Sequence, residues 1–389
     1  MIAFLYPGQG SQHAGMGAPW RQHESWELVT EASDITGRDI AQLLLEADDE
    51  ELRETRNAQL ATFVLSMVAF DAVSRLGIET SGHAGHSLGE YSALVASGVL
   101  DFGDGVRLVQ ERGQAMQAAA DEHDGTMAAI IGLDDDQVEA AVADVADCWV
   151  ANYNTPGQVV IAGGPAGVEA GAAAAKDAGA KRVLPLVVGG AFHTPHMAPA
   201  QERLDKAIAQ TDFRAPDKPV YANVDASAHT TADPWAGLLH DQLTGAVRWS
   251  ATLAAMVDTG YATFVEIGPG TALTGMVKRI DRGTKRLNVN APGDLDQLLE
   301  ELGGRDSTEP AQGEHLYVTE RLVVSPCGGV FVPDTAVVGG TTIVTGDCLG
   351  TVGECDVRSP FAGEIVEFLA LPGERVTLAQ PIAWLRTAS

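Results

Sequence analysis

A serine in a glycine-bounded turn is the residue of this chain best suited to covalent chemistry. Ser87 lies in GHSLGEY, residues 85–91, which fits the pattern G-x-S-x-G. In that pattern a strained turn between a strand and a helix exposes the serine hydroxyl, and the next N–H can stabilise an oxyanion. Glycine is needed on both sides because side chains there would crowd the turn. The alternative for Ser87 is a helix-capping serine in a Gly-rich turn.

A base must lie beside such a serine, because an unactivated hydroxyl is a poor nucleophile. The chain has 10 histidines, and His193 in the loop-like segment GAFHTPHM is our candidate base. From the residues alone, His86 and His196 are near-equal candidates. A hydrolase of the α/β type would also show an acid between serine and histidine, and none is identifiable here.

The elements that must position these residues follow an α/β pattern. Residues 1–6 predict a buried strand that ends at the turn PGQGSQ, residues 59–76 predict a helix, and a strand-turn-helix surrounds Ser87 with its helix at 91–96. This order is typical of a parallel-sheet, hydrolase-like core with covering helices. Residues 126–188 read βαββαβ, which predicts an inserted ferredoxin-like subdomain. A helix from Ala200, a strand at 219–225 and a further strand-turn-helix at 263–280 return to the core.

A second domain is expected after the polar segment GGRDSTEPAQGE, which predicts a linker at 303–314. Residues 315–389 alternate short β-branched runs with Gly, Pro and Asp turns, a pattern that predicts a small all-β, barrel-like domain. The first domain is therefore 1–302.

The composition of the chain indicates its class and the kinds of partner it can bind. With 45% hydrophobic and 20% charged residues, the 389-residue chain is typical of a soluble globular protein of two or three domains. Its net charge of −28 argues against nucleic acid or an anionic membrane as a partner. The first ten residues support neither a signal peptide nor a membrane span, so we expect a cytoplasmic protein. A zinc site from Cys327, Cys348, Cys355 and His315 is disfavoured because it has no CxxC pair.

Six ordered motifs carry a family resemblance: PGQGSQ (7–12), GHSLGEY (85–91), ERGQAMQ (111–117), NYNTPGQVVIAG (152–163), AFHTPHM (191–197) and EIGPGTALTGMVKRI (266–280). Over about 290 residues the chain resembles the malonyl-CoA:acyl-carrier-protein transacylases, whose fold also serves as the acyltransferase domain of polyketide synthases.

The resemblance implies a role for each matching residue. Ser87 is the acylated serine, His193 the general base, and Gln9 with the backbone N–H of Leu88 forms the oxyanion hole. Arg112 holds the malonyl carboxylate, for which a guanidinium with two parallel hydrogen bonds is well suited. The family orients the base through a backbone carbonyl, and Gln242 matches that position. Asn154 lines the pocket, and the ring of Phe192 crowds a methyl branch on the acyl group.

The implied reaction is a ping-pong transfer from malonyl-CoA to the phosphopantetheine thiol of an acyl carrier protein, for fatty-acid or polyketide synthesis, with no covalently bound cofactor and no metal. The alternative is an acyl hydrolase, or an editing or partner-recruiting protein of a polyketide synthase. One basic run is either a carrier-docking patch or a solvated helix end: Lys278, Arg279, Arg282, Lys285 and Arg286.

The C-terminal domain resembles biotinyl/lipoyl attachment domains through SPCGGVF, VTGDCLGTV and SPFAGEIVEF. Such domains present a lysine at a hairpin tip, where this chain reads GECDVR. No lysine follows Lys285, which excludes biotin or lipoate attachment by the usual amide. The domain is either a carrier fold reused for contacts or a β-barrel whose periodicity alone produces the resemblance, and we favour the first. Its contacts would be with a synthase complex or carrier protein, or with the transacylase body.

Overall fold

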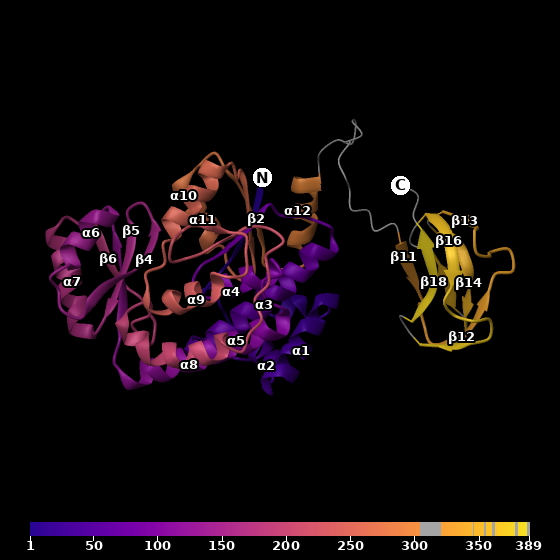
Figure 1. Cartoon of the computed structure of the whole chain (residues 1–389), viewed down its shortest axis with the longest axis horizontal. Coiled ribbons are helices and arrows are strands. Elements are labelled where there is room, and N and C mark those ends of the chain that lie inside the picture. The colour runs from indigo at the N-terminus through magenta and orange to yellow at the C-terminus, as the bar shows by residue number, and fades with distance from the viewer. Residues whose placement is uncertain (304–319, 345, 354, 360–361, 378–379, 387–389) are drawn as a thin grey trace. The chain divides into compact units, whose positions relative to one another are not determined.

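The computed structural model describes residues 1–303, 320–344, 346–353, 355–359, 362–377 and 380–386 (Figure 1). The chain divides into two compact units, Met1–Arg305 and Asp306–Ser389. Apart from Gly303, the predicted linker at 303–314 lies outside the described residues.

A six-stranded sheet forms the centre of the first unit, in the order β10-β9-β1-β2-β7-β8. Its strands are β1 (Ile2–Tyr6), β2 (Gly82–Gly85), β7 (Val220–Tyr221), β8 (Ala228–His229), β9 (Thr263–Ile267) and β10 (Lys285–Val289). All neighbours pair in parallel except β7 and β8. Tyr6 pairs with Gly85, so the loops that follow β1 and β2 leave the same edge of the sheet side by side. The carboxyl edge of a parallel sheet is where such folds place their sites.

Strand β7 is shorter than the predicted strand at 219–225. The backbone of Asn223 leaves the ladder, because its N–H donates to Glu90 and its carbonyl accepts from the N–H of Arg248. The prediction was therefore wrong for the second half of this segment, where a turn with other backbone and side-chain partners replaces strand pairing.

Helices surround the sheet, some packed on its strands and others on neighbouring helices. They are α1 (Glu27–Thr36), α2 (Ile40–Leu45), α3 (Thr55–Arg75), α4 (Gly89–Ala96), α5 (Phe102–Glu122), α8 (Ala198–Ile208), α9 (Trp235–Thr244), α10 (Trp249–Thr259), α11 (Ala272–Ile280) and α12 (Asp294–Gly303). Short 3₁₀ turns are η1 (Ala18–Trp20), η2 (Glu24–Trp26), η3 (Glu51–Arg53) and η4 (Pro195–Met197). Helix α3 is long and apolar enough to cross a membrane, but 83% of its apolar window is buried inside the protein. It is thus a core helix, and the location of the protein in the cell stays a prediction.

An antiparallel subdomain is inserted between α5 and η4. It consists of β3 (Thr126–Ile131), α6 (Asp135–Val142), β4 (Cys148–Thr155), β5 (Gln158–Gly163), α7 (Pro165–Asp177) and β6 (Arg182–Pro185). The strand order is β4-β5-β3-β6, and α6 and α7 cover one face of the sheet (Figure 1). The subdomain has its own apolar cluster, which includes Ile130, Val138 and Ile161. The predicted βαββαβ order is confirmed, although β6 ends three residues before the predicted position 188.

The second unit is all-β, as its alternating pattern predicted. Its strands are β11 (Glu320–Val324), β12 (Gly329–Pro333), β13 (Thr342–Ile343), β14 (Cys348–Val352), β15 (Cys355–Arg358), β16 (Gly363–Phe368), β17 (Arg375–Val376) and β18 (Pro381–Arg386). They form two four-stranded sheets, β11-β18-β16-β13 and β15-β14-β12-β17, around a core that includes Phe331, Leu349 and Ile365. Val352 pairs with Cys355, so β14 and β15 form a tight hairpin. His315 lies outside the described residues, among which no three metal-ligating side chains come together.

Candidate active site

Ser87 lies in a tight turn between β2 and α4, with a left-handed backbone φ of 52°. A Cβ at Gly85 would overlap the carbonyl oxygen of Gly89, and a Cβ at Gly89 would overlap that of Tyr6. Both positions therefore accept only glycine. A non-glycine residue at positive φ is strained and persists only when its surroundings hold it, so the turn is a built feature of the fold.

His193 is the histidine that reaches Ser87. Its Nε2 lies 2.7 Å from the hydroxyl Oγ of Ser87, and its Nδ1 lies 2.9 Å from the backbone carbonyl of Gln242. A carbonyl can only accept, so Nδ1 carries the proton and Nε2 is the free acceptor for the serine proton. The two competing histidines have other partners, since His86 contacts Asn154 and His196 contacts Asp147.

His193 is held in its neutral form. Burial, and after it the nearby positive charge of Arg112, lower its pKa to about 3. Within the described residues no carboxylate contacts the ring. The site is thus a serine-histidine pair oriented by a backbone carbonyl, with the histidine in the unprotonated form that a general base needs at neutral pH.

Arg112, on α5, is a buried cation that contacts only neutral groups. It is 1% exposed, and its guanidinium donates to Gln59 Oε1 (2.7 Å), Gln242 Oε1 (3.1 Å) and Ser87 Oγ (3.2 Å). Its guanidinium carbon lies 5.4 Å from the centre of the Tyr91 ring, and its buried Nε has no hydrogen-bond partner in the described chain. A buried charge is costly unless it is paired. An anion next to Ser87 would therefore be attracted to this guanidinium.

The predicted oxyanion donors lie at the ends of two adjacent strands. Leu88 is the N-cap residue of α4, and Gln9 follows β1 in the neighbouring loop. Neither backbone N–H donates a hydrogen bond to any group that the structure describes. Gly8 permits this approach, because a Cβ there would overlap the carbonyl oxygen of His86. Two N–H groups with no partner are thus placed near the serine.

A cavity of about 230 Å³ opens above Ser87 and His193. The inserted subdomain supplies Asn152, Asn154 and Val160, and α11 supplies Ala272, Leu273 and Met276. Phe192 also lines the cavity, together with Leu186 and Val188 from the segment after β6. The wall is largely apolar, and Ser87, His193 and Arg112 form one polar cluster in it. This is the arrangement expected for an acyl chain that enters with one polar end.

Three residues of this site were not predicted from the sequence. Asn223 accepts from the N–H of Ser87 (2.7 Å), Gln59 holds Arg112, and Glu90 binds both Asn223 and Gln242. Asn223 and Gln59 come from segments with no recognisable motif. Glu90 did carry a signal, because it is a charged residue within GHSLGEY at the start of an otherwise apolar helix.

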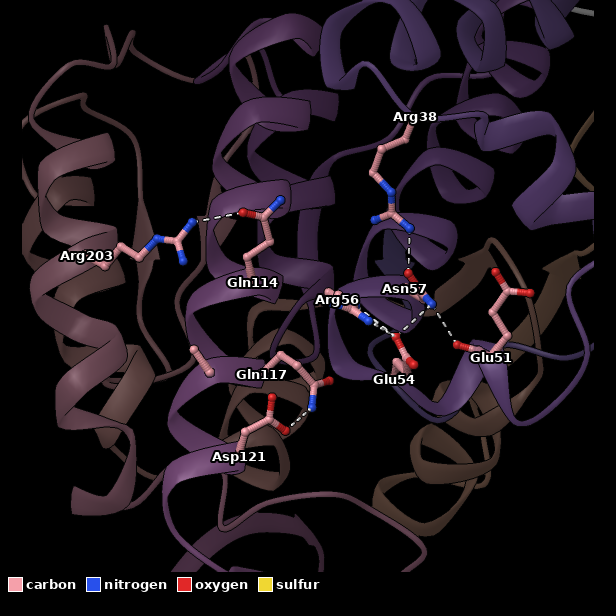
Figure 2. A pocket seen from close by; sticks show the side chains of 10 residues that line it. Arg38, Glu51, Glu54, Arg56, Asn57, Gln114, Gln117, Asp121 and Arg203 are labelled. Carbon is pink, nitrogen blue, oxygen red and sulfur yellow. Dashed lines mark hydrogen bonds and ion pairs between the residues drawn. The ribbon is translucent and has the colours of Figure 1, made fainter.

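A second cavity, of about 700 Å³, lies on the other face of α5 (Figure 2). It is lined by charged and amide side chains that already bind one another. Arg203 donates to Gln114, Arg56 pairs with Glu54, and Gln117 donates to Asp121. We assign it no role in the chemistry at Ser87.

Comparison with known proteins agrees with this geometry. The acyl transferase domain family matches residues 3–290, and the chain therefore belongs to that family. It is 39% identical to the malonyl CoA-acyl carrier protein transacylase of Bacillus subtilis and 42% identical to that of Escherichia coli K12, each over 77% of this chain and at least 97% of the relative. 

Solved structures of malonyl transacylases are also similar to this chain. A malonyl transacylase in complex with its type II polyketide synthase acyl carrier protein is 40% identical, with a TM-score of 0.74 over 77% of this chain and 99% of the other. The transacylase of Coxiella burnetii is 36% identical, with a TM-score of 0.75 over 77% of this chain and 97% of the other.

Proposed function

We propose that this protein transfers a malonyl group from malonyl-CoA to the phosphopantetheine thiol of an acyl carrier protein, through an acyl-Ser87 intermediate. One observation carries the proposal: Ser87 Oγ lies within hydrogen-bond distance of both a neutral histidine and a buried guanidinium that no carboxylate neutralises in the described chain. The histidine serves the nucleophile, and the guanidinium selects an acyl group with a free carboxylate. The relatives named above are malonyl transacylases, which supports the same reaction.

In the first half-reaction His193 Nε2 takes the Ser87 proton as Oγ attacks the thioester carbonyl of malonyl-CoA. The carbonyl oxygen becomes an oxyanion, which the N–H groups of Gln9 and Leu88 stabilise. The carbon–sulfur bond then breaks, and the CoA thiolate leaves with the proton from His193. During these steps the carbonyl of Gln242 keeps the imidazole in one tautomer and orientation.

In the second half-reaction the carrier thiol replaces CoA. His193 takes the thiol proton, the sulfur attacks the ester carbonyl, and the proton returns to Ser87 Oγ as the ester bond breaks. Throughout, the malonyl carboxylate binds Arg112, which gains a charged partner in place of neutral ones. The role of Phe192 is to restrict a branch on the acyl chain.

We propose an acyl carrier protein as the partner of the basic run, of which Lys285 and Arg286 already have partners within the chain. Lys285 forms an ion pair with Glu301 (2.6 Å), and Arg286 donates to backbone carbonyls that include that of Thr284. Lys278 and Arg282 have no ion-pair partner in the described chain, and Arg279 binds only Gln158. We propose that these three contact the acidic carrier, because complementary charge guides such encounters. A relative forms a complex with its acyl carrier protein, which supports a carrier as the partner.

We also propose a fold type for the inserted subdomain and for the second unit. The strand order β4-β5-β3-β6 supports a ferredoxin-like subdomain at about 126–188, inserted in a hydrolase-like core at 1–302. Two four-stranded antiparallel sheets and the tight β14–β15 hairpin support a biotinyl/lipoyl-like domain at 315–389. Without a lysine that domain carries no biotin or lipoate, and we propose that it binds a partner.

The test is to incubate the protein with radiolabelled malonyl-CoA, with and without a phosphopantetheinylated carrier protein. Label on the protein without carrier, lost in Ser87→Ala, and its transfer to the carrier support the proposal. Free malonate in place of malonyl-carrier would overturn it in favour of an acyl hydrolase.

A further inference from the structure

Glu90 is a buried carboxyl that the acyl-transfer steps above do not use. It lies in the first turn of α4, three residues after Ser87, and is 0% exposed. Burial raises its pKa to about 8, although two hydrogen bonds and the charge of Arg112 act in the opposite direction. Burying a carboxyl without a direct cationic partner costs free energy of folding, which its hydrogen bonds must offset. Its position therefore calls for an explanation.

One oxygen of Glu90 carries two hydrogen bonds. Oε2 accepts from the backbone N–H of Asn223 and from the side-chain Nε2 of Gln242, both at 3.0 Å. The other oxygen, Oε1, is buried and has no partner in the described chain. The carboxyl thus joins the loop after β7 to helix α9, two segments far from it in sequence.

Asn223 and Gln242 in turn hold both peptide groups of Ser87. The side chain of Asn223 accepts from the N–H of Ser87 and donates to the carbonyl of Gly85, both at 2.7 Å. The Nε2 of Gln242 donates to the carbonyl of Ser87 at 2.9 Å. These bonds brace the backbone on both sides of the residue whose φ is 52°.

Gln242 also connects Glu90 to the other two site residues. Its backbone carbonyl accepts from His193, and its Oε1 accepts from Arg112. A rotation of the Gln242 side chain would therefore release the carbonyl of Ser87 and one partner of Arg112 together. The bond to Glu90 prevents that rotation.

We propose that Glu90 is a positioning residue that fixes the reactive geometry of Ser87 by anchoring Asn223 and Gln242. It touches no reacting atom. This proposal rests on the proposed function only where malonyl transfer is measured. The reactivity of Ser87 can be measured without malonyl-CoA.

The test compares Glu90→Met, which keeps the side-chain length without an acceptor, with Glu90→Gln, which keeps one accepting oxygen. The probe is a small fluorophosphonate, which reacts with nucleophilic serines. We expect the rate of Ser87 labelling and kcat for malonyl transfer to fall together by about 10- to 100-fold in Glu90→Met. KM for malonyl-CoA should change less than about threefold, and Glu90→Gln should stay within about threefold of the parent in both rates.

Glu266 supplies a matched control, because its carboxyl is equally buried but binds the N–H groups of Leu273 and Thr274. Glu266 does not contact Asn223 or Gln242, and it can affect Ser87 only through the cavity wall that Leu273 forms. Glu266→Met should therefore lose stability while its loss of labelling stays well below that of Glu90→Met. If Glu90→Met does not fold, Glu90→Asp takes its place, since the shorter side chain draws the oxygen away from both donors. Parental labelling in folded Glu90→Met or Glu90→Asp would overturn the proposal, and so would an equal loss in Glu90→Gln. Normal labelling of the parent without malonyl transfer would instead count against the proposed function alone.

Discussion

The guanidinium of Arg112 donates to the hydroxyl of Ser87 across 3.2 Å, while His193 contacts the same oxygen from Nε2 at 2.7 Å. The nucleophile thus lies between its base and a buried cation. An acyl group attached to Oγ starts its chain beside the guanidinium, so a carboxylate two carbons from the ester has a charged partner within the same small cavity.

Arg112→Ala should therefore change the choice of acyl group more than the ability to acylate. We expect kcat/KM for malonyl-CoA to fall about 100-fold or more, because charge-assisted hydrogen bonds are lost, and that for acetyl-CoA to be unchanged or higher. Steady-state transfer with both thioesters measures the ratio. Arg112→Lys, which keeps the charge without the two-pronged geometry, should fall between. A constant malonyl-to-acetyl ratio in both variants would remove the carboxylate-binding role.

The pH dependence of serine acylation should show a histidine that stays neutral in acid. Because the pKa of His193 is lowered to about 3, the fraction of free base changes little as the pH falls from about 8 to about 5. The burst of acyl-enzyme formation should be level over that range and decline below it. If ionisation of Glu90 causes an inflection of the acylation rate near pH 8, that inflection should be absent in Glu90→Gln. A midpoint close to 6.5 would contradict the buried, neutral state of His193.

Glu90 also makes the stability of the fold depend on pH. Its folded pKa of about 8 is above the ordinary value of 4.5, so its contribution is complete below pH 4.5 and is lost as the pH rises through 8. Glu90→Gln cannot ionise and escapes that loss. We expect its Tm, compared with that of the parent at each pH, to rise by several degrees between about pH 6 and pH 9. A Tm difference that is flat with pH would show that Glu90 titrates near its ordinary value.

Phe192 should set the tolerance for a branch. The ring lines the cavity one residue before His193 and is buried. Phe192→Ser opens space there, and we expect the methylmalonyl-to-malonyl ratio of kcat/KM to rise about 10- to 100-fold, the range available to one methyl group. Competition between the two thioesters for the same carrier measures that ratio. Phe192→Leu, which keeps most of the volume, should move the ratio far less.

The second unit should affect binding of the carrier or synthase partner and not the acylation of Ser87. Every residue that lines the cavity lies before position 277. A chain that ends at Gly303 should load Ser87 from malonyl-CoA at the parental rate and lose efficiency only with its native carrier or synthase partner. Burst kinetics and carrier titrations distinguish the two. Parental efficiency with the native partner would leave the β unit without the role proposed for it.

The sequence predicted those helices, strands and turns whose residue patterns lie within one short segment of the chain. The glycines of GHSLGEY and the alternation of helix and strand between 126 and 188 describe short segments, and both were found where they were expected. The histidine that serves Ser87 could not be chosen that way, because His86, His193 and His196 are equivalent until the chain is folded. The motif resemblance supplied that choice.

Long-range contacts account for what the sequence did not predict. Asn223 is 136 positions from Ser87, and Gln59 is 53 positions from Arg112. No spacing rule connects such pairs, since their approach depends on the order of strands in the sheet. The premature end of β7 has the same origin, because the backbone N–H of Asn223 is drawn to Glu90.

Among the residues that the structure describes, only four other than glycine have a positive φ, and two of them are Ser87 and His193. Glycine at either position would relieve that strain, typically of order 1–3 kcal/mol. A stability-guided redesign that reads only the backbone would therefore select the nucleophile and its base among its first replacements. Two of the four substitutions that such a redesign would choose first would therefore abolish activity.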